Sequence, residues 1–283
     1  MKNDFAVFIL SHGRANNLIT LKTLDKIGYT GKTYIIIDNE DEQEEEYKKL
    51  NVEDVIIFDK NKMIEKTDTA DNFKDHRLVV YDRNKCWDIA KKLGIKYFLV
   101  LDDDYSSFDF RFIKDNKFKA KKIKNADKLF LKTIEFLEKS GALTIAYAQA
   151  GDFIGGKDNG NYKKEVLRKA MNSFFCMTDR PFKFSGSTNE DVNAYITYGM
   201  KGKLMFTITK VSVVQKMTQQ NPGGLTDIYL DNGTYVKSFY SVIHEPSCVK
   251  VALMGSNNKR IHHKINWDKC CPKILNEKWK RSE

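Results

Sequence analysis

The chain has 283 residues, of which 41% are hydrophobic and 12% aromatic. This composition excludes a disordered chain, and the length suffices for a full core in one large domain or two small ones. Lysine and arginine outnumber aspartate and glutamate by 48 to 38, a formal net charge of +10. Such an excess favours a polyanionic partner or an anionic membrane surface, but a merely soluble basic protein fits it equally well.

The sequence carries no sign of export or membrane insertion. The apolar run near the N-terminus is too short for a signal peptide, and no stretch is long enough to cross a bilayer. The five cysteines are odd in number and lack a CxxC spacing, which indicates reduced thiols. We therefore expect a cytoplasmic protein without a membrane span, whose oligomeric state the sequence does not predict.

Apolar runs of strand length alternate with helical patterns through the first hundred residues. Strands are predicted over residues 5–10, 33–37, 54–58 and 96–101, and helices over residues 17–27, 42–50 and 78–93, with a loop at 59–76. This alternation predicts an α/β fold with a mostly parallel, Rossmann-like sheet flanked by helices. Ligands of such sheets bind at the carboxyl ends of the strands.

The second half of the chain is less regular. Helices are predicted over residues 125–140 and 190–198, strands over 142–150 and 203–209, and loops over 151–161 and 222–224. Residues 256–283 are basic and are predicted to end in a disordered tail. Because no repeat or low-complexity linker divides the chain, one continuous domain over residues 1–283 is the simplest expectation.

The predicted strand at 96–101 ends in three consecutive carboxylates, Asp102, Asp103 and Asp104. Like charges repel and lose hydration when buried, so the triplet gains nothing structural for the fold. A divalent cation held between these carboxylates and a phosphorylated ligand would explain it, with Asp102 and Asp104 facing the ion. Asp102 and Asp103 are also expected to contact the nucleotide part of that ligand. The alternative is a solvated turn.

Other polar side chains follow the first two strands. Ser11 and Arg14 lie in the loop after the first strand, and Asp38 ends the second. Arg14 has the forked donors that suit a diphosphate, and a carboxylate at Asp38 suits ribose or base recognition. The alternatives are a surface cation for Arg14 and, for Asp38, the N-cap of the acidic helix that follows.

Two further pairs complete the candidate site. Arg83 and Asn84, on the helix before the aspartate strand, are expected to reach the nucleotide, unless they only cap or solvate that helix. Glu190 and Asp191 follow a loop of small residues at 185–188. Asp191, or Glu190 in its place, suits a general base for an acceptor hydroxyl, although a hydroxyl residue before acids also marks a helix start.

Of the five histidines, His262 and His263 lie in the basic stretch 259–264. One imidazole, for which His262 is the candidate, would complete a metal coordination that carboxylates alone leave to water. A phosphate-binding surface is the alternative.

Several of these features together resemble a GT-A glycosyltransferase: the opening FAVFILSHGRANN, the strand ending at Asp38, the Arg83-Asn84 helix, the LVLDDD strand, the NED segment and the late histidines. More narrowly, the chain is similar to the TET/JBP-associated glycosyltransferases that tailed phages encode beside DNA-base hydroxylases. The resemblance implies a hexosyltransferase with a UDP-sugar donor and Mn²⁺ or Mg²⁺. It also implies an acceptor in DNA, a hydroxymethylated pyrimidine base.

The resemblance matches Asp102 and Asp104 to the DxD positions of the family, and Asp191 to the acidic residue that serves as base in inverting members. The triplet leaves the DxD register uncertain by one residue.

On this basis residues 1–124 form a nucleotide-sugar-binding half, residues 125–270 an acceptor-binding half, and residues 271–283 a basic tail. Three alternatives remain at this stage. One is a glycosyltransferase for polysaccharide or protein, another an inactive nucleic-acid-binding module on the same fold, and the third a nucleotidyltransferase.

Overall fold

The structure, a computed structural model, describes residues 1–215, 225–233, 235–255 and 259–270. The strands of the large sheet are β1 (Phe5–Leu10), β2 (Lys32–Asp38), β3 (Asp54–Phe58), β4 (Tyr97–Asp102), β5 (Tyr105–Lys114), β6 (Lys117–Lys122), β7 (Thr144–Ala148), β8 (Val166–Leu167), β9 (Phe174–Met177) and β10 (Met205–Gln215). A second, two-stranded sheet comprises β11 (Val249–Met254) and β12 (Arg260–Ile265).

The α-helices are α1 (Ile19–Lys26), α2 (Glu44–Tyr47), α3 (Lys60–Ile64), α4 (Val80–Lys92), α5 (Ala126–Ser140), α6 (Gly160–Lys163), α7 (Glu190–Met200), α8 (Leu225–Asn232), α9 (Lys237–His244) and α10 (Trp267–Cys270). Short 3₁₀ turns are η1 (Ala15–Asn17), η2 (Ala150–Phe153) and η3 (Gly156–Asp158). In the described part of the chain, no helix is both long and apolar enough for a membrane span.

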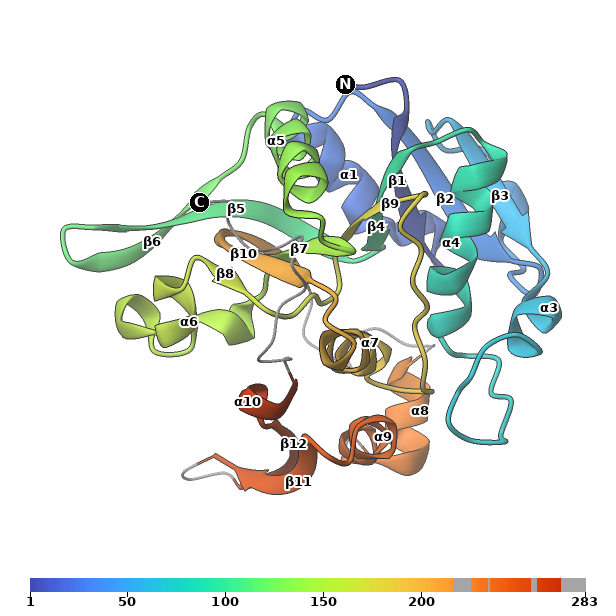
Figure 1. The fold of residues 1–283 in the computed structure, drawn as a ribbon. Helices are drawn as coiled ribbons and strands as arrows, with labels where there is room; N and C mark the ends of the chain where they lie inside the picture. The colour runs from blue at the N-terminus through green and yellow to red at the C-terminus, as the bar shows by residue number, and fades with distance from the viewer. Residues whose placement is uncertain (216–224, 234, 256–258, 271–283) are drawn as a thin grey trace.

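The ten-stranded sheet has the order β3-β2-β1-β4-β9-β7-β10-β5-β6, and β8 pairs with β10 (Figure 1). Strands β3, β2, β1 and β4 are parallel to one another. Strand β9 is inserted antiparallel between β4 and β7, so β7 and its parallel neighbour β10 run in the direction of β4. The predicted mostly parallel sheet of a GT-A-like, Rossmann-type fold is therefore confirmed.

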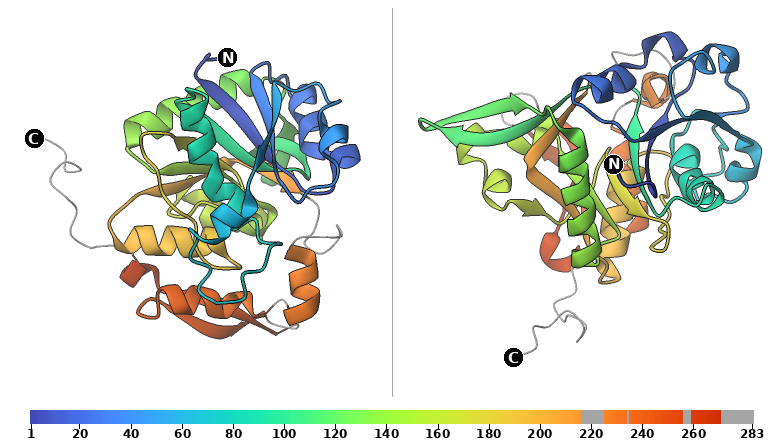
Figure 2. Two further views of the ribbon diagram at one scale, coloured as in Figure 1. Left: turned by 90° about the vertical axis from the view of Figure 1, so that its right-hand side faces the viewer. Right: turned by 90° about the horizontal axis from the view of Figure 1, so that it is seen from above.

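Alternate side chains of β1 enter two separate cores. Phe5, Val7 and Ile9 pack with residues of α1 and α5, whereas Ala6 and Phe8 pack with residues of α4 and α7. Helices therefore cover both faces of the sheet (Figures 1 and 2). Burial on both faces is why this strand, like its parallel neighbours, is a continuous apolar run rather than an alternating one.

Several elements depart from the sequence predictions. The helix expected at 17–27 is divided into η1 and α1, and the loop expected at 59–76 contains α3. Strands β5, β6 and β9 were not predicted, and β10 extends to Gln215, beyond the expected end at residue 209. These strands carry lysines, or are antiparallel insertions that the simple alternation of strands and helices does not anticipate.

Part of the basic segment at 256–283 has regular structure. Residues 260–265 form β12, which pairs with β11 from Val249↔Ile265 to Met254↔Arg260, and residues 267–270 form α10. The basic tail expected at 271–283 and the loop expected at 222–224 lie outside the described residues.

Candidate active site

Polar side chains gather where β1, β2, β3 and β4 end. Leu10 at the end of β1 pairs with Ile36 of β2 and with Asp102 of β4, and Asp38 of β2 pairs with Phe58 of β3. Because these strands are parallel and in register, their carboxyl ends meet at one edge of the sheet. The expected convergence of the loop after β1, Asp38 and the aspartate triplet therefore occurs at that edge.

The middle carboxylate of the triplet, Asp103, is buried and turned toward the loop after β1. Ser11 Oγ donates to its Oδ2 at 2.7 Å, and Arg14 Nη1 lies 2.9 Å from its Oδ1. Ser11 Oγ also lies 2.9 Å from the Tyr47 hydroxyl. Ser11 and Arg14, predicted to bind a nucleotide, thus fix the position of the triplet in this structure.

The backbone of the triplet is held by Thr20 on α1. Its Oγ1 donates to the Asp102 carbonyl at 2.6 Å and accepts from the Tyr105 N–H at 2.8 Å, while the Thr20 N–H donates to the Asp103 carbonyl at 2.9 Å. Three hydrogen bonds from one residue thus fix the turn between β4 and β5, and with it the directions of the three side chains. The solvated turn that was the alternative prediction does not describe this arrangement.

Asp102 and Asp104, on either side of Asp103, are only partly buried. The Asp102 carboxylate accepts from the Tyr105 hydroxyl at 3.2 Å. Burial, together with the charges of Asp102 and Asp103, raises the pKa of Asp104 to about 7. Like charges held this close favour a cation among them, because it would offset the repulsion.

The donor chemistry of Asp102 and Asp104 fits Mn²⁺ or Mg²⁺, which prefer carboxylate oxygens and keep positions for water and phosphate. Within the described ranges, no three His, Cys, Asp or Glu side chains lie together as a complete metal site. His262 is therefore not gathered with Asp102 and Asp104, and its role as a ligand stays a prediction. A cation held by two protein carboxylates and by phosphate oxygens of the substrate would match the way proteins usually bind Mg²⁺.

Arg83 joins the aspartate triplet to the start of α7. Its buried guanidinium places Nη1 2.5 Å from Glu190 Oε1 and Nη2 3.3 Å from Asp102 Oδ1. The guanidinium also lies 5.1 Å from the centre of the Phe174 ring. In this structure Arg83 bridges two carboxylates, and its predicted contact with a nucleotide stays a prediction.

Asn84 makes a structural clamp. Its Nδ2 donates to the Phe184 carbonyl at 2.9 Å, and its Oδ1 accepts from the Phe184 N–H at 2.8 Å. Both ends of the amide are engaged by one residue, so the side chain aligns the segment before α7 with α4. The predicted contact of Asn84 with a nucleotide stays a prediction.

Glu190 and Asp191 form the first turn of α7, and both are buried. Burial raises the pKa of each carboxyl, while Arg83 opposes the rise. Asp191 Oδ1 accepts the Val192 N–H at 2.7 Å. Lys237 on α9 lies near enough to act electrostatically on Asp191, and burial lowers the pKa of that lysine. Glu190 and Asp191 therefore begin a helix and are also the candidate general bases.

The loop before α7 is held in an unusual backbone conformation. Gly186 has φ +92°, and a Cβ there would lie 2.3 Å from Asn193 Nδ2. The same Nδ2 donates to the carbonyls of Ser185 at 2.9 Å and Thr188 at 3.2 Å. A side chain at residue 186 would displace the amide that fixes the loop, so glycine is required here.

The second sheet contacts this loop through His263. The Nδ1 atom of His263 lies 3.2 Å from Nδ2 of Asn189, which also donates to the Lys237 carbonyl at 2.8 Å. Burial lowers the pKa of His263 to about 4, so its imidazole is neutral at physiological pH. His262 lies against the His263 ring, with 4.2 Å between the ring centres. The histidine turned toward the NED segment is therefore His263.

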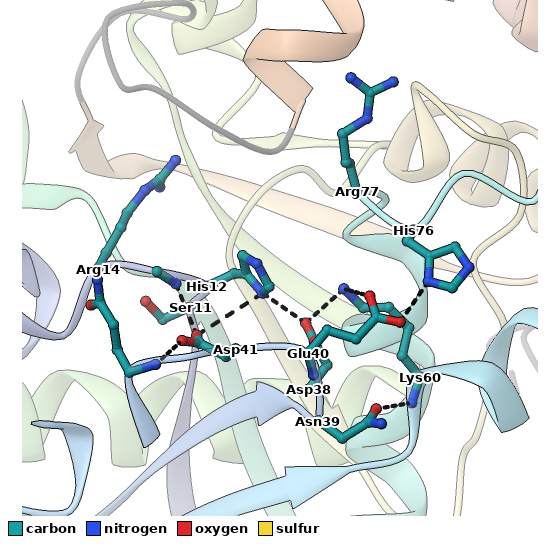
Figure 3. Close-up of polar contacts among 12 residues, drawn as sticks. Ser11, His12, Arg14, Asp38, Asn39, Glu40, Asp41, Lys60, His76 and Arg77 are labelled. Atoms are coloured by element: carbon teal, nitrogen blue, oxygen red, sulfur yellow. Dashed lines mark hydrogen bonds and ion pairs between the residues drawn. The ribbon is translucent and has the colours of Figure 1, made fainter. Parts of the chain in front are cut away.

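An ionic chain that sequence reasoning missed surrounds Asp38 (Figure 3). Its Oδ2 lies 2.7 Å from Lys60 Nζ and 2.9 Å from His12 Nδ1. These two partners outweigh burial and lower the pKa of Asp38 to about 2. Glu40 extends the chain, with Oε2 3.7 Å from Lys60 Nζ and Oε1 2.6 Å from His76 Nδ1. Asp38 is thus a buried, ionised group at the site edge.

The alternative reading of Asp38 as a helix N-cap is wrong, because α2 begins at Glu44 and its N-cap residue is Gln43. The neighbouring Asp41 fixes the local backbone instead, by accepting from the Gly13 N–H at 2.8 Å and from the Gln43 N–H at 2.9 Å. Lys60 was missed because it lay in a presumed loop. Its signal was available, since it closely follows the third parallel strand.

The fold, a mostly parallel sheet with helices on both faces, is of the GT-A-like class. Comparison with protein families matches residues 5–224 to TET-Associated Glycosyltransferase, and the chain belongs to that family. It is therefore a glycosyltransferase. A search of curated proteins gives no match. Elements α8 to α10 and β11 to β12 lie beyond the matched residues.

Proposed function

We propose that this chain transfers a sugar from a UDP-sugar to the hydroxyl group of a hydroxymethylated pyrimidine in DNA, with Mn²⁺ or Mg²⁺. One observation supports this most strongly. Arg83 lies between Asp102 and Glu190, so the carboxylates at the end of β4 and those at the start of α7 belong to one cluster. A donor bound at β4 would then have a candidate base beside it.

Asp191 is the general base in this proposal. Glu190 is already paired with Arg83 at 2.5 Å, and protonating Glu190 would leave the buried guanidinium without that counter-charge. Asp191 keeps its carboxylate beside the cluster, with a hydrogen bond from its own helix. Its raised pKa suits proton removal near neutral pH better than an ordinary carboxylate does. Asp191 takes the acceptor proton while the hydroxyl oxygen bonds to the anomeric carbon and the diphosphate leaves.

Asp102 and Asp104 would hold the divalent cation, which when bound offsets the negative charge of the departing diphosphate. Ser11, Arg14 and Asp103 hold the turn on which these carboxylates stand. The ionised Asp38 at the neighbouring strand end supports recognition of the ribose or base of the donor. Each role is assigned from position, charge and donor chemistry.

The DNA acceptor rests on the family membership and on the formal charge of +10. A polyanionic acceptor concentrates at a positively charged surface, whereas a neutral polysaccharide gains nothing from the charge. A base inside a duplex would have to leave the stack to reach a buried carboxylate such as Asp191. The enzyme would thus combine electrostatic capture of DNA with local extrusion of the modified base.

The test is a transfer assay with hydroxymethylated DNA, a panel of radiolabelled UDP-sugars and Mn²⁺. We expect label on DNA with the wild type, a loss of about 10²-fold or more with Asp191→Asn, and normal transfer with the control Asp88→Asn. Asp88 is an exposed carboxylate on α4, with a side chain 69% accessible. Label on polysaccharide or protein but never on DNA would show that the acceptor is not DNA. Plain DNA binding without transfer from any donor would indicate an inactive binding module.

A further inference from the structure

The hairpin of β5 and β6 projects from the body of the protein (Figures 1 and 2). β10 pairs with β5 only as far as Phe110, so the outer part of the hairpin is a two-stranded ribbon. Asp115 and Asn116 join the strands with φ values of +52° and +56°. Two consecutive positive φ values define the tight turn that matches the twist of the strands. The ribbon is thus a regular element.

The two faces of the ribbon differ in chemistry. Residues directly opposite each other in an antiparallel pair share a face. The pairs on one face are Phe110↔Lys121, Phe112↔Lys119 and Lys114↔Lys117, and we name these six residues the lysine face. On the opposite face, Phe118 packs against Phe153, with 5.3 Å between ring centres, and against Tyr162, with 4.9 Å.

The charge of the hairpin is strongly positive. Residues 105–124 contain seven lysines and arginines against two aspartates, a net charge of +5, which is half the +10 of the whole chain. One of the two aspartates, Asp115, lies 3.7 Å from Lys119. Phe110 on the lysine face has 42% of its surface exposed, so an accessible aromatic ring shares that face with the lysines. Cations interleaved with aromatic rings are typical of nucleic-acid surfaces.

We infer that the lysine face of the β5–β6 ribbon is the surface that binds duplex DNA, an inference that rests on the DNA acceptor proposed above. A two-stranded ribbon fits the major groove of B-DNA, whereas the major groove of A-form RNA is too narrow to admit it. β5 begins at Tyr105, immediately after Asp104, so the ribbon extends outward from the catalytic edge. Its tip lies about 30 Å along the strand from the triplet. DNA held on the ribbon would therefore lead to the site.

The contact between Phe118 and the η2–α6 segment gives the ribbon a fixed base. The Tyr162 hydroxyl donates to the Arg111 carbonyl at 3.2 Å, and the Arg111 guanidinium lies 5.2 Å from the centre of the Phe153 ring. These contacts hold the inner part of the ribbon from the face that lacks the lysine row. The lysine face itself is open to solvent and accessible to a partner.

The experiment compares two quadruple variants of the full chain in binding to a fluorescent duplex over a range of salt concentrations. In the ribbon variant, Lys114, Lys117, Lys119 and Lys121 are changed to Gln. The matched control changes four exposed lysines to Gln: Lys62 on α3, Lys66 just after α3, and Lys91 and Lys92 on α4. We expect the ribbon variant to lose about 3 from the slope of log affinity against log salt, and at least tenfold in affinity at 100 mM salt, and the control to match the wild type.

The same proteins are then assayed for transfer to hydroxymethylated duplex. The ribbon variant should show a raised KM for DNA with an unchanged kcat at saturation. If it binds DNA and transfers sugar like the control, the inference is wrong while the proposed function stands. If the ribbon variant loses binding but wild-type protein labels no DNA with any donor, the surface is right and the proposed reaction is wrong. Equal loss of binding to heparin or anionic vesicles would show a general anion surface and overturn the assignment to DNA.

Discussion

Replacing Arg83 with Met tests whether one buried guanidinium holds the two halves of the site together. Arg83 is 3% exposed and lies 2.5 Å from Glu190 and 3.3 Å from Asp102. Met fills a similar volume but leaves Glu190 buried without its cation. Breaking a buried ion pair on one side costs about 3–5 kcal/mol. For a domain of this size the loss is a large part of the total stability.

The loss should depend on pH. Without Arg83 the pKa of Glu190 rises further, because the main charge that opposes the effect of burial is gone. A raised pKa in the folded state means that stability is lost as pH rises through it. Urea unfolding followed by circular dichroism should therefore show a larger loss at pH 8.5 than at pH 6. The double variant R83M/E190Q should recover part of the loss. A loss under about 1 kcal/mol, or the same loss at both pH values, would refute the bridging role.

The same electrostatics predict how transfer and stability depend on pH and on metal. The transfer rate should fall as pH is lowered through the raised pKa of Asp191, and this limb should be absent from the pH profile of Asp191→Asn. Without metal above pH 7, Asp104→Asn should raise stability and Tm, because the pKa of that carboxyl is raised to about 7 and its ionised form is disfavoured in the folded state. Mn²⁺ with UDP should raise the Tm of the wild type but not of Asp104→Asn. The lowered pKa of Asp38, about 2, predicts that roughly 2 kcal/mol of stability is present above pH 4 and lost toward pH 2. Lys60→Met should remove much of it, as measured by urea unfolding at pH 3 and 7.

The parallel half of the fold was predictable because β1, β2 and β4 are buried on both faces and the edge strand β3 is still mostly apolar. β1, β2 and β3, and β4 up to its first aspartate, are runs of apolar residues whose limits differ little from those predicted. The β5–β6 hairpin was missed because its lysines disguise the alternation of a strand, although Asp115-Asn116 is a turn signal. β9 could not be predicted from local pattern, since its place between β4 and β7 is decided by tertiary packing.

The site was predictable in its location and less so in its contacts. Strand ends placed Asp38, Asp102 and Asp104 together, because parallel strands present their carboxyl ends at one edge. The spacing could not tell that Arg83 would bridge Asp102 to Glu190, since those residues are 19 and 107 positions away in sequence. Partners that distant are fixed by how α4 and α7 pack on the sheet, which no local pattern contains.

The segment beyond residue 224 bears on how a minimal active fragment should be cut. Asn189 immediately precedes Glu190 and Asp191, the candidate general bases. Its side chain contacts Lys237 and Ser241 of α9 and His263 of β12. A fragment trimmed to the family-matched region would lose these anchors. The residues that hold the candidate site in place therefore extend beyond the residues that match the family.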